Sequence, residues 1–266
     1  MNDKLSGLKR INGNTLKVIA CVIMLIDHMT AGIMIPVVRS GLYDETVPFE
    51  KIEFAYEVLR AIGRNSFPIF CFLLVEGFIH TSSRLRYAFG LLVFGIVSEP
   101  FYDAILNTEE EFFNPNFSEL FKANMPYMNE QCNVFFTLLL GLIAIWSIEK
   151  IFALKIPFEI RALISFAVSA GIIFVAEKIH CDYHGFGVAV IIIFYVLRMY
   201  EPLNLMAGYC VLTLIEREYA SLPSFILMYF YNKKRGIKLG VLKYLFYLFY
   251  PVHIFLVYVI RCRIYG

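Results

Sequence analysis

Two ionisable residues stand eleven positions apart at the head and middle of an apolar stretch, residues 17 to 38. On an α-helix, Lys17 and His28 would lie about 20° apart around the axis and roughly 16 Å apart along it. A cation with an imidazole a long reach below it suits an extended ligand that has an anionic head and a reactive tail. His28 could then act as a general base. The alternative is a histidine that bonds another helix for packing alone.

Coenzyme A matches that spacing, because its phosphates could pair with Lys17 while the pantetheine arm carries a thioester to His28. Asp27 points about 100° away from His28 on a helix, so we expect it to meet a residue of another helix. Glu99 should lie at a depth similar to His28, which makes it a candidate orienting group for the imidazole. We therefore predict His28, Asp27 and Glu99 as the catalytic set.

Further polar residues interrupt other apolar stretches and are candidates for binding the acceptor. Arg64 could hold a carboxylate or phosphate, or simply extend toward the membrane surface. Glu76 is explained equally well by a structural ion pair. Asn133 could link helices by hydrogen bonds, and Asp182 stands in a turn-forming segment, 181–187. The predicted substrate-binding residues are Arg64, Glu76, Asn133 and Asp182.

A basic segment, residues 232–243, precedes the last apolar stretch. Its cations are explained by topology alone, since cytoplasmic loops of membrane proteins are rich in Lys and Arg. The functional interpretation gives them to the phosphates of coenzyme A, on the same side as Lys17. The predicted cofactor-binding residues are Lys17, Arg235, Lys243, Tyr244 and His253. Neither the cysteines nor the histidines have metal-ligand spacing, so no metal is expected.

These residues must be positioned by helices that cross a membrane. Of the 266 residues, 59% are hydrophobic and 17% are charged, which exceeds the apolar share of soluble domains. The net charge of +2 gives no reason to expect nucleic acid as a partner. We predict an all-α, polytopic transmembrane bundle of nine or ten helices forming one domain, residues 1–266. The expected spans are 15–37, 61–80, 86–106, 132–148, 161–178, 185–199, 203–216, 219–231 and 244–261.

Charge in the loops alternates along the chain and predicts orientation. The N-terminal tail, 81–86, 149–161 and 232–243 are basic, whereas 40–57 and 107–131 are acidic. The N-terminus is therefore expected in the cytoplasm, with the chain in a bacterial inner or plasma membrane. The basic tail "RCRIYG" conflicts with this pattern, because a nine-helix count places it outside.

Several segments, taken in order, resemble the TraX family of integral membrane proteins: "LKVIACVIMLIDHM", "RNSFPIFCFLLVEGFIHT", "NVFFTLLLG", "DYHGFGV" and "KYLFYLFYPVH". That family is in turn similar to the membrane acyltransferase-3 group, whose basic residue followed ten residues later by His matches Lys17 and His28. The resemblance implies acyl-CoA as a cytosolic donor and His28 as the base. The paired arginines of that group have no clear counterpart here, Arg60 and Arg64 being the nearest.

These observations predict a membrane acyltransferase that moves an acetyl group from acetyl-CoA to a hydroxyl or amine of an acceptor. The acceptor could be a protein N-terminus, a peptide, a polysaccharide or a glycolipid, with membrane lipids as further partners. One alternative is a small transporter or proton relay that uses the intramembrane Asp, His and Glu residues. Another is an assembly factor without catalytic activity, in which His28 would be replaceable.

Overall fold

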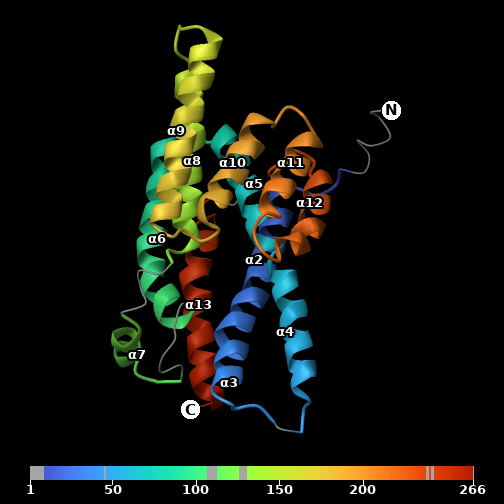
Figure 1. Cartoon of the computed structure of the whole chain (residues 1–266), viewed down its shortest axis with the longest axis vertical. Coiled ribbons are helices and arrows are strands. Elements are labelled where there is room, and N and C mark those ends of the chain that lie inside the picture. The colour runs from blue at the N-terminus through green and yellow to red at the C-terminus, as the bar shows by residue number, and fades with distance from the viewer. Residues whose placement is uncertain are drawn as a thin grey trace.

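The computed structural model describes residues 9–44, 46–106, 113–125, 131–237, 240 and 243–265, and it is helical in these parts (Figure 1). The predicted all-α class is confirmed. The elements in chain order are α2 (Gly13–Met29), the π-helix η1 (Thr30–Met34), α3 (Ile35–Arg39), α4 (Phe49–Gly63), α5 (Ser66–His80), α6 (Arg84–Ile105), α7 (Phe117–Asn124), α8 (Val134–Phe152), α9 (Phe158–Lys178), α10 (His184–Val196), α11 (Leu203–Leu212), the short 3-10 helix η3 (Glu218–Ser221), α12 (Leu222–Tyr229) and α13 (Lys243–Tyr265).

Six helical segments of the described chain are long and apolar enough to cross a membrane: Gly13–Arg39, Phe49–His80, Arg84–Ile105, Val134–Phe152, Phe158–Lys178 and Leu245–Ile264. This supports a multi-pass membrane protein. Three of the nine expected spans correspond to shorter helices, α10, α11 and α12, of 13, 10 and 8 residues. Such lengths fall short of the roughly 20 residues that a full crossing needs, so the exact count of nine or ten stays a prediction.

The first segment runs through α2, η1 and α3 without a break in helical structure. Asn12 caps its start by accepting a hydrogen bond from the Thr15 amide at 3.0 Å, which satisfies one of the first free N–H groups. The π-helix that follows widens the turn, and π-helical turns of this kind are frequent at functional sites. Asp27 and His28 lie in the last turn before that widening.

The acidic loop expected at 40–57 is wrong in its second half, where α4 forms. Apolar residues recur there with helical period among charged ones, and the exposed side of α4 carries the charges. A long average over this stretch is only weakly hydrophobic, which hides the period. Between α4 and α5 the chain bends at Asn65, whose Nδ2 donates to the carbonyls of Ala61 and Ile62, both at 3.1 Å.

The core lies where α10 packs against α5, α8, α9 and α11. Close approach of α8 and α10 depends on Gly141, because a Cβ there would lie 2.3 Å from Cδ1 of Ile191. By contrast, α9 buries little of its surface, and its side chains Leu163 and Phe166 are 68% and 73% exposed. An apolar, exposed helix face of this kind is normal for a helix that faces lipid.

One end of the bundle gathers segments that are far apart in sequence. Lys9 pairs with Glu201, Lys233 approaches the same carboxylate at 3.8 Å, and the Gly13 amide donates to the Lys234 carbonyl at 2.9 Å. The N-terminal tail, the α10–α11 connection and the basic loop therefore share one side, as the charge alternation predicted. That this side is cytoplasmic remains a prediction.

Arg261 accounts for the basic tail that conflicted with the charge pattern. Its side chain is fully buried, and Nη1 donates to the carbonyls of Gly32 and Ile105, both at 3.1 Å. It thereby ties α13 to the π-helix and to the end of α6. Because this guanidinium is an interior bonding group rather than a loop charge, it carries no information about orientation.

Candidate functional site: buried ion pairs and a histidine pair

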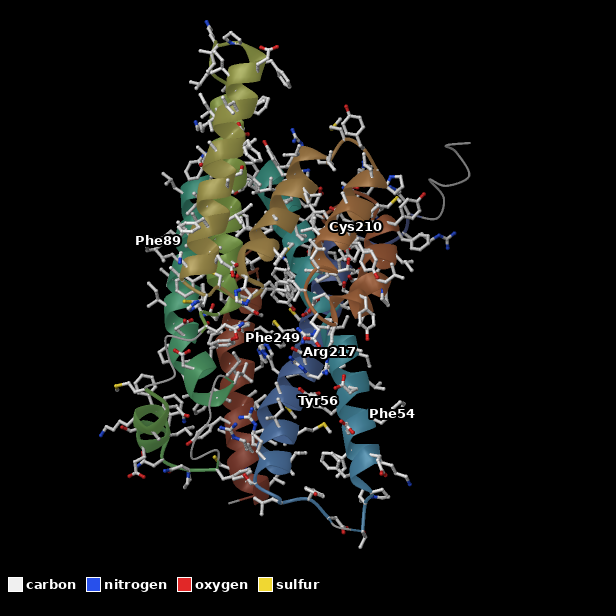
Figure 2. The ribbon with its side chains drawn as sticks, in the orientation of Figure 1. Phe54, Tyr56, Phe89, Cys210, Arg217 and Phe249 are labelled. Atoms are coloured by element: carbon white, nitrogen blue, oxygen red, sulfur yellow. The ribbon has the colours of Figure 1, made fainter. Side chains whose placement is uncertain are left out.

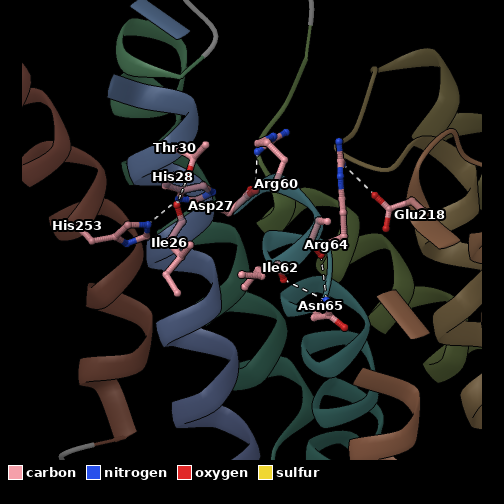
Figure 3. Close-up of polar contacts among 11 residues, drawn as sticks. Ile26, Asp27, His28, Thr30, Arg60, Ile62, Arg64, Asn65, Glu218 and His253 are labelled. Atoms are coloured by element: carbon pink, nitrogen blue, oxygen red, sulfur yellow. Dashed lines mark hydrogen bonds and ion pairs between the residues drawn. The ribbon is translucent and has the colours of Figure 1, made fainter. Parts of the chain in front are cut away.

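Asp27 forms an ion pair with Arg60 across the contact between α2 and α4 (Figure 3). Arg60 Nη1 lies 2.6 Å from Asp27 Oδ1, and the two side chains are 22% and 20% exposed. The helices approach this closely because residue 63 is glycine: a Cβ there would lie 2.0 Å from the same Oδ1. Asp27 thus meets a residue of another helix, and Gly63 makes the room.

A second ion pair lies one helical turn further along α4. Arg64 Nη1 stands 2.9 Å from Oε1 of Glu218, a side chain with no exposed surface. Burial raises the pKa of Glu218 to about 7, and the charge of Arg64 counteracts that rise. Since a buried, ionised carboxylate is stable only with a partner, Arg64 is held here by Glu218. Figure 3 shows that both arginines project from the same helix toward different partners.

His28 and His253 form the third element of the site. Nδ1 of His28 lies 2.6 Å from Nε2 of His253, and the two rings are within 10° of parallel. Tyr250 packs edge-on against His28, with ring centroids 5.5 Å apart. His253 was predicted to bind the cofactor, but its side chain is buried against the other predicted imidazole instead.

Hydrogen-bond chemistry fixes where the protons of this pair lie. Nδ1 of His253 is 2.6 Å from the Phe249 carbonyl, which can only accept, so this nitrogen donates. In the neutral ring Nε2 is then an acceptor, and His28 must donate to it from Nδ1. The remaining nitrogen of His28, Nε2, therefore carries a lone pair. That atom can accept a proton or a hydrogen bond from another group.

Glu99 does not orient His28. It accepts hydrogen bonds from Asn133 instead, one from the amide at 3.1 Å and one from the side-chain nitrogen. Asn133 in turn caps α8 by accepting from the Phe135 amide at 3.0 Å. Glu99 and Asn133 thus form a fixed start for α8. Asp182 accepts a hydrogen bond from the Gln131 side chain at 3.2 Å.

The remaining predicted residues lie nearer the end that holds the N-terminus. Glu76 accepts a hydrogen bond from the Tyr231 hydroxyl at 3.0 Å, so it has a structural partner. Lys17 lies 5.0 Å from the centre of the Phe246 ring, and the Arg235 carbonyl accepts from the Asn14 amide at 3.0 Å. Lys243 and Tyr244 fall among residues whose side chains are not described. Binding of acetyl-CoA by these groups stays a prediction.

The sequence did not single out Glu218, and it named Arg60 only as a substitute for an arginine of another group. Arg60 and Arg64 are four residues apart, which places both on one helix face. That spacing becomes visible only once α4 is recognised as a helix. Glu218 follows a short apolar helix in a polar stretch, where nothing in the local pattern separates a buried carboxylate from an exposed one.

Comparison with known proteins gives two matches and one negative result. The family model described as TraX protein matches residues 12–261. A probable fimbrial assembly protein, FimC of serogroup H1 from Dichelobacter nodosus, is 30% identical over 260 residues, covering 90% of this chain and 91% of that protein. No solved structure matches the chain.

These matches correct the predicted activity. The expected function, acetyl transfer from acetyl-CoA by a membrane acyltransferase, is wrong: the family and the relative point to a membrane protein of pili or fimbriae. Neither match links the chain to the acyltransferase-3 group. The spacing of Lys17 and His28 was consistent with acyl transfer, but a two-residue pattern of this kind also arises when a helix-end cation and a packing histidine share a face.

The family match begins at the cap of α2 and ends in the last turns of α13. It therefore includes every residue of the two ion pairs and of the histidine pair. The predicted resemblance is confirmed, and the chain belongs to the TraX protein family.

Proposed function

We propose that this chain is an integral membrane component of fimbrial assembly, located in the cell membrane with its N-terminus in the cytoplasm. One observation carries the proposal: similarity to a fimbrial assembly protein extends over 90% of this chain and 91% of the relative. A shared role is better supported when neither protein has a large unmatched part that could hold a separate activity.

The ion pairs of Asp27 with Arg60 and of Arg64 with Glu218 are the part of the molecule that we assign to this role. Ionisable side chains within membrane spans cost at least ~2.5 kcal/mol each on insertion scales, and such residues are functional candidates by default. Packing alone would be served as well by apolar side chains of similar volume.

His28 adds a group with unused bonding capacity to the same region. Its Nε2 lone pair can accept a hydrogen bond, and the neighbouring Asp27 is held toward α4 by Arg60. A polar group of a fimbrial subunit that enters the bundle would find an acceptor at this imidazole. We infer that the site engages such a group during assembly, while α5, α8 and α10 supply the rigid support.

The test is a deletion strain of the source organism, complemented with the wild-type gene or with single variants. Surface fimbriae are counted by electron microscopy, and the fimbrial subunit in the membrane fraction is measured by immunoblot. We expect the deletion to remove surface fimbriae while the subunit accumulates in the membrane. His28→Ala should restore fewer fimbriae than the wild type at equal protein level. A deletion strain with normal fimbriae would refute the proposal.

A further inference from the structure

A cavity of about 250 Å³ lies between α4 and the segment that includes η3. It is separate from the histidine pair, because its walls are formed by a single face of α4 and by residues 217–220. Figure 2 labels Phe54, Tyr56 and Arg217, which lie beside one another at this place. The lining residues are Phe54, Tyr56, Glu57, Val58, Arg60, Ala61, Arg64, Arg217, Tyr219 and Ala220.

The wall of this cavity is cationic although the surrounding ion pairs are balanced. Arg60, Arg64 and Arg217 line it, against a single carboxylate, Glu57. The partners of the first two arginines, Asp27 and Glu218, are not part of the wall. Each of these arginines bonds a carboxylate through Nη1, and a guanidinium has further N–H donors. An anion in the cavity would therefore meet several donors and one opposing charge.

The cavity changes from cationic to apolar along α4. Phe54 is ten residues before Arg64, which corresponds to about 15 Å along the helix. Phe54 and Val58 are 71% and 42% exposed, so the apolar end opens toward the surroundings of the bundle. In a membrane protein, those surroundings are lipid chains. The cavity thus matches a molecule with an anionic head and a hydrocarbon tail.

Arg217 is the arginine best placed to respond to such a ligand. It has a positive φ of 66°, which is uncommon for a residue other than glycine and can mark a functional position. Its side chain is 53% exposed and pairs with Glu57, 45% exposed, at 2.7 Å. Because exposed ion pairs contribute little stability, this pair can open without cost to the fold.

We propose that the cavity binds an anionic phospholipid, with the phosphate among Arg60, Arg64 and Arg217 and the acyl chains along Phe54 and Val58. Guanidinium groups suit this ligand because they bond phosphate oxygens in pairs. The proposal goes beyond the role in fimbrial assembly, and either can fail without the other.

The test is native mass spectrometry of the purified, delipidated full-length protein. It is incubated with phosphatidylglycerol, with phosphatidylcholine of the same acyl chains, or with glycerol phosphate as the head alone. We expect the wild type to retain phosphatidylglycerol about tenfold better than phosphatidylcholine. Arg217→Gln should reduce that retention about tenfold, whereas Glu57→Gln should increase it, because it removes the opposing charge. Arg263→Gln, an exposed arginine on α13, is the matched control.

Three results would overturn the proposal. Equal retention of the two lipids by the wild type would exclude selection by head-group charge. A loss in Arg263→Gln as large as in Arg217→Gln would show that surface charge in general is responsible. Competition by glycerol phosphate as strong as by the lipid itself would exclude the acyl-chain part of the site. Both Gln variants change exposed side chains, so their folding is checked by equal thermal stability.

Discussion

Gly63→Ala should break the ion pair between Asp27 and Arg60 without changing any charge. The new methyl group would lie 2.0 Å from Oδ1, 2.5 Å from Cγ and 2.6 Å from Cβ of Asp27. These are backbone-proximal atoms, so rotation of a flexible side-chain end cannot relieve the clash. Either Asp27 must leave its position beside Arg60, or α2 and α4 must separate.

The expected loss follows from the burial of the pair. Leaving one partner of a buried pair without its counter-ion costs about 3–5 kcal/mol, and the lower value applies because both side chains are about one-fifth exposed. Alanine gains roughly 0.5–1 kcal/mol over glycine within a helix, which offsets part of that cost. We expect a net loss of about 2 kcal/mol, or a Tm lower by about 4–8 °C.

The assay is thermal unfolding of the detergent-purified protein, with Gly171→Ala as control. Gly171 lies within α9, and a Cβ there would meet no atom within 4 Å, so the same substitution should leave the Tm unchanged or slightly raised. Asp27→Asn in the Gly63→Ala background should add little further loss, since the pair is already broken. Equal Tm values for Gly63→Ala and the wild type would refute this account of the α2–α4 contact.

Three further predictions concern the histidine pair, the buried arginine and the buried glutamate. Nitrogen NMR should show His28 protonated at Nδ1 in the wild type, and His253→Ala should release that preference; an Nε2-protonated His28 in the wild type would contradict the hydrogen-bond chain. Arg261→Met should lower stability by about 2–3 kcal/mol, because two buried carbonyls lose a charged donor, whereas the exposed Arg263→Met should change it by less than about 0.5 kcal/mol; equal effects would be inconsistent with the contacts of Arg261. The stability of the wild type relative to Glu218→Gln should fall as pH rises from about 4.5 to about 7, since only the unfolded carboxyl ionises in that range; a difference independent of pH would contradict the raised pKa.

Much of the helical framework could be predicted from the sequence because long apolar stretches have few alternatives in a membrane. The segments around Asp27 and around Glu99 fell within predicted spans, and both form helices. The short helices α11 and α12 were expected as full spans. Their apolar composition is the same whether a helix crosses or packs inside the bundle, so composition alone does not set their length.

The partners of the polar residues were less predictable than their positions. Similar depth suggested that Glu99 faces His28, but depth does not say which helix faces which, and Glu99 bonds Asn133 instead. Recognition of the Asp27–Arg60 pair required α4, whose charged outer face hides its helical period. The room at Gly63 follows only from the packed helices.

The central claim is that the charged contact between α2 and α4 serves fimbrial assembly, and complementation with Arg60→Gln tests it most directly. The deletion strain would carry the wild type, Arg60→Gln or Gly171→Ala, each at equal level in the membrane fraction, with surface fimbriae counted by electron microscopy. We predict that the wild type and Gly171→Ala restore fimbriae, while Arg60→Gln restores few or none. Full fimbriation by Arg60→Gln at that level would contradict the claim.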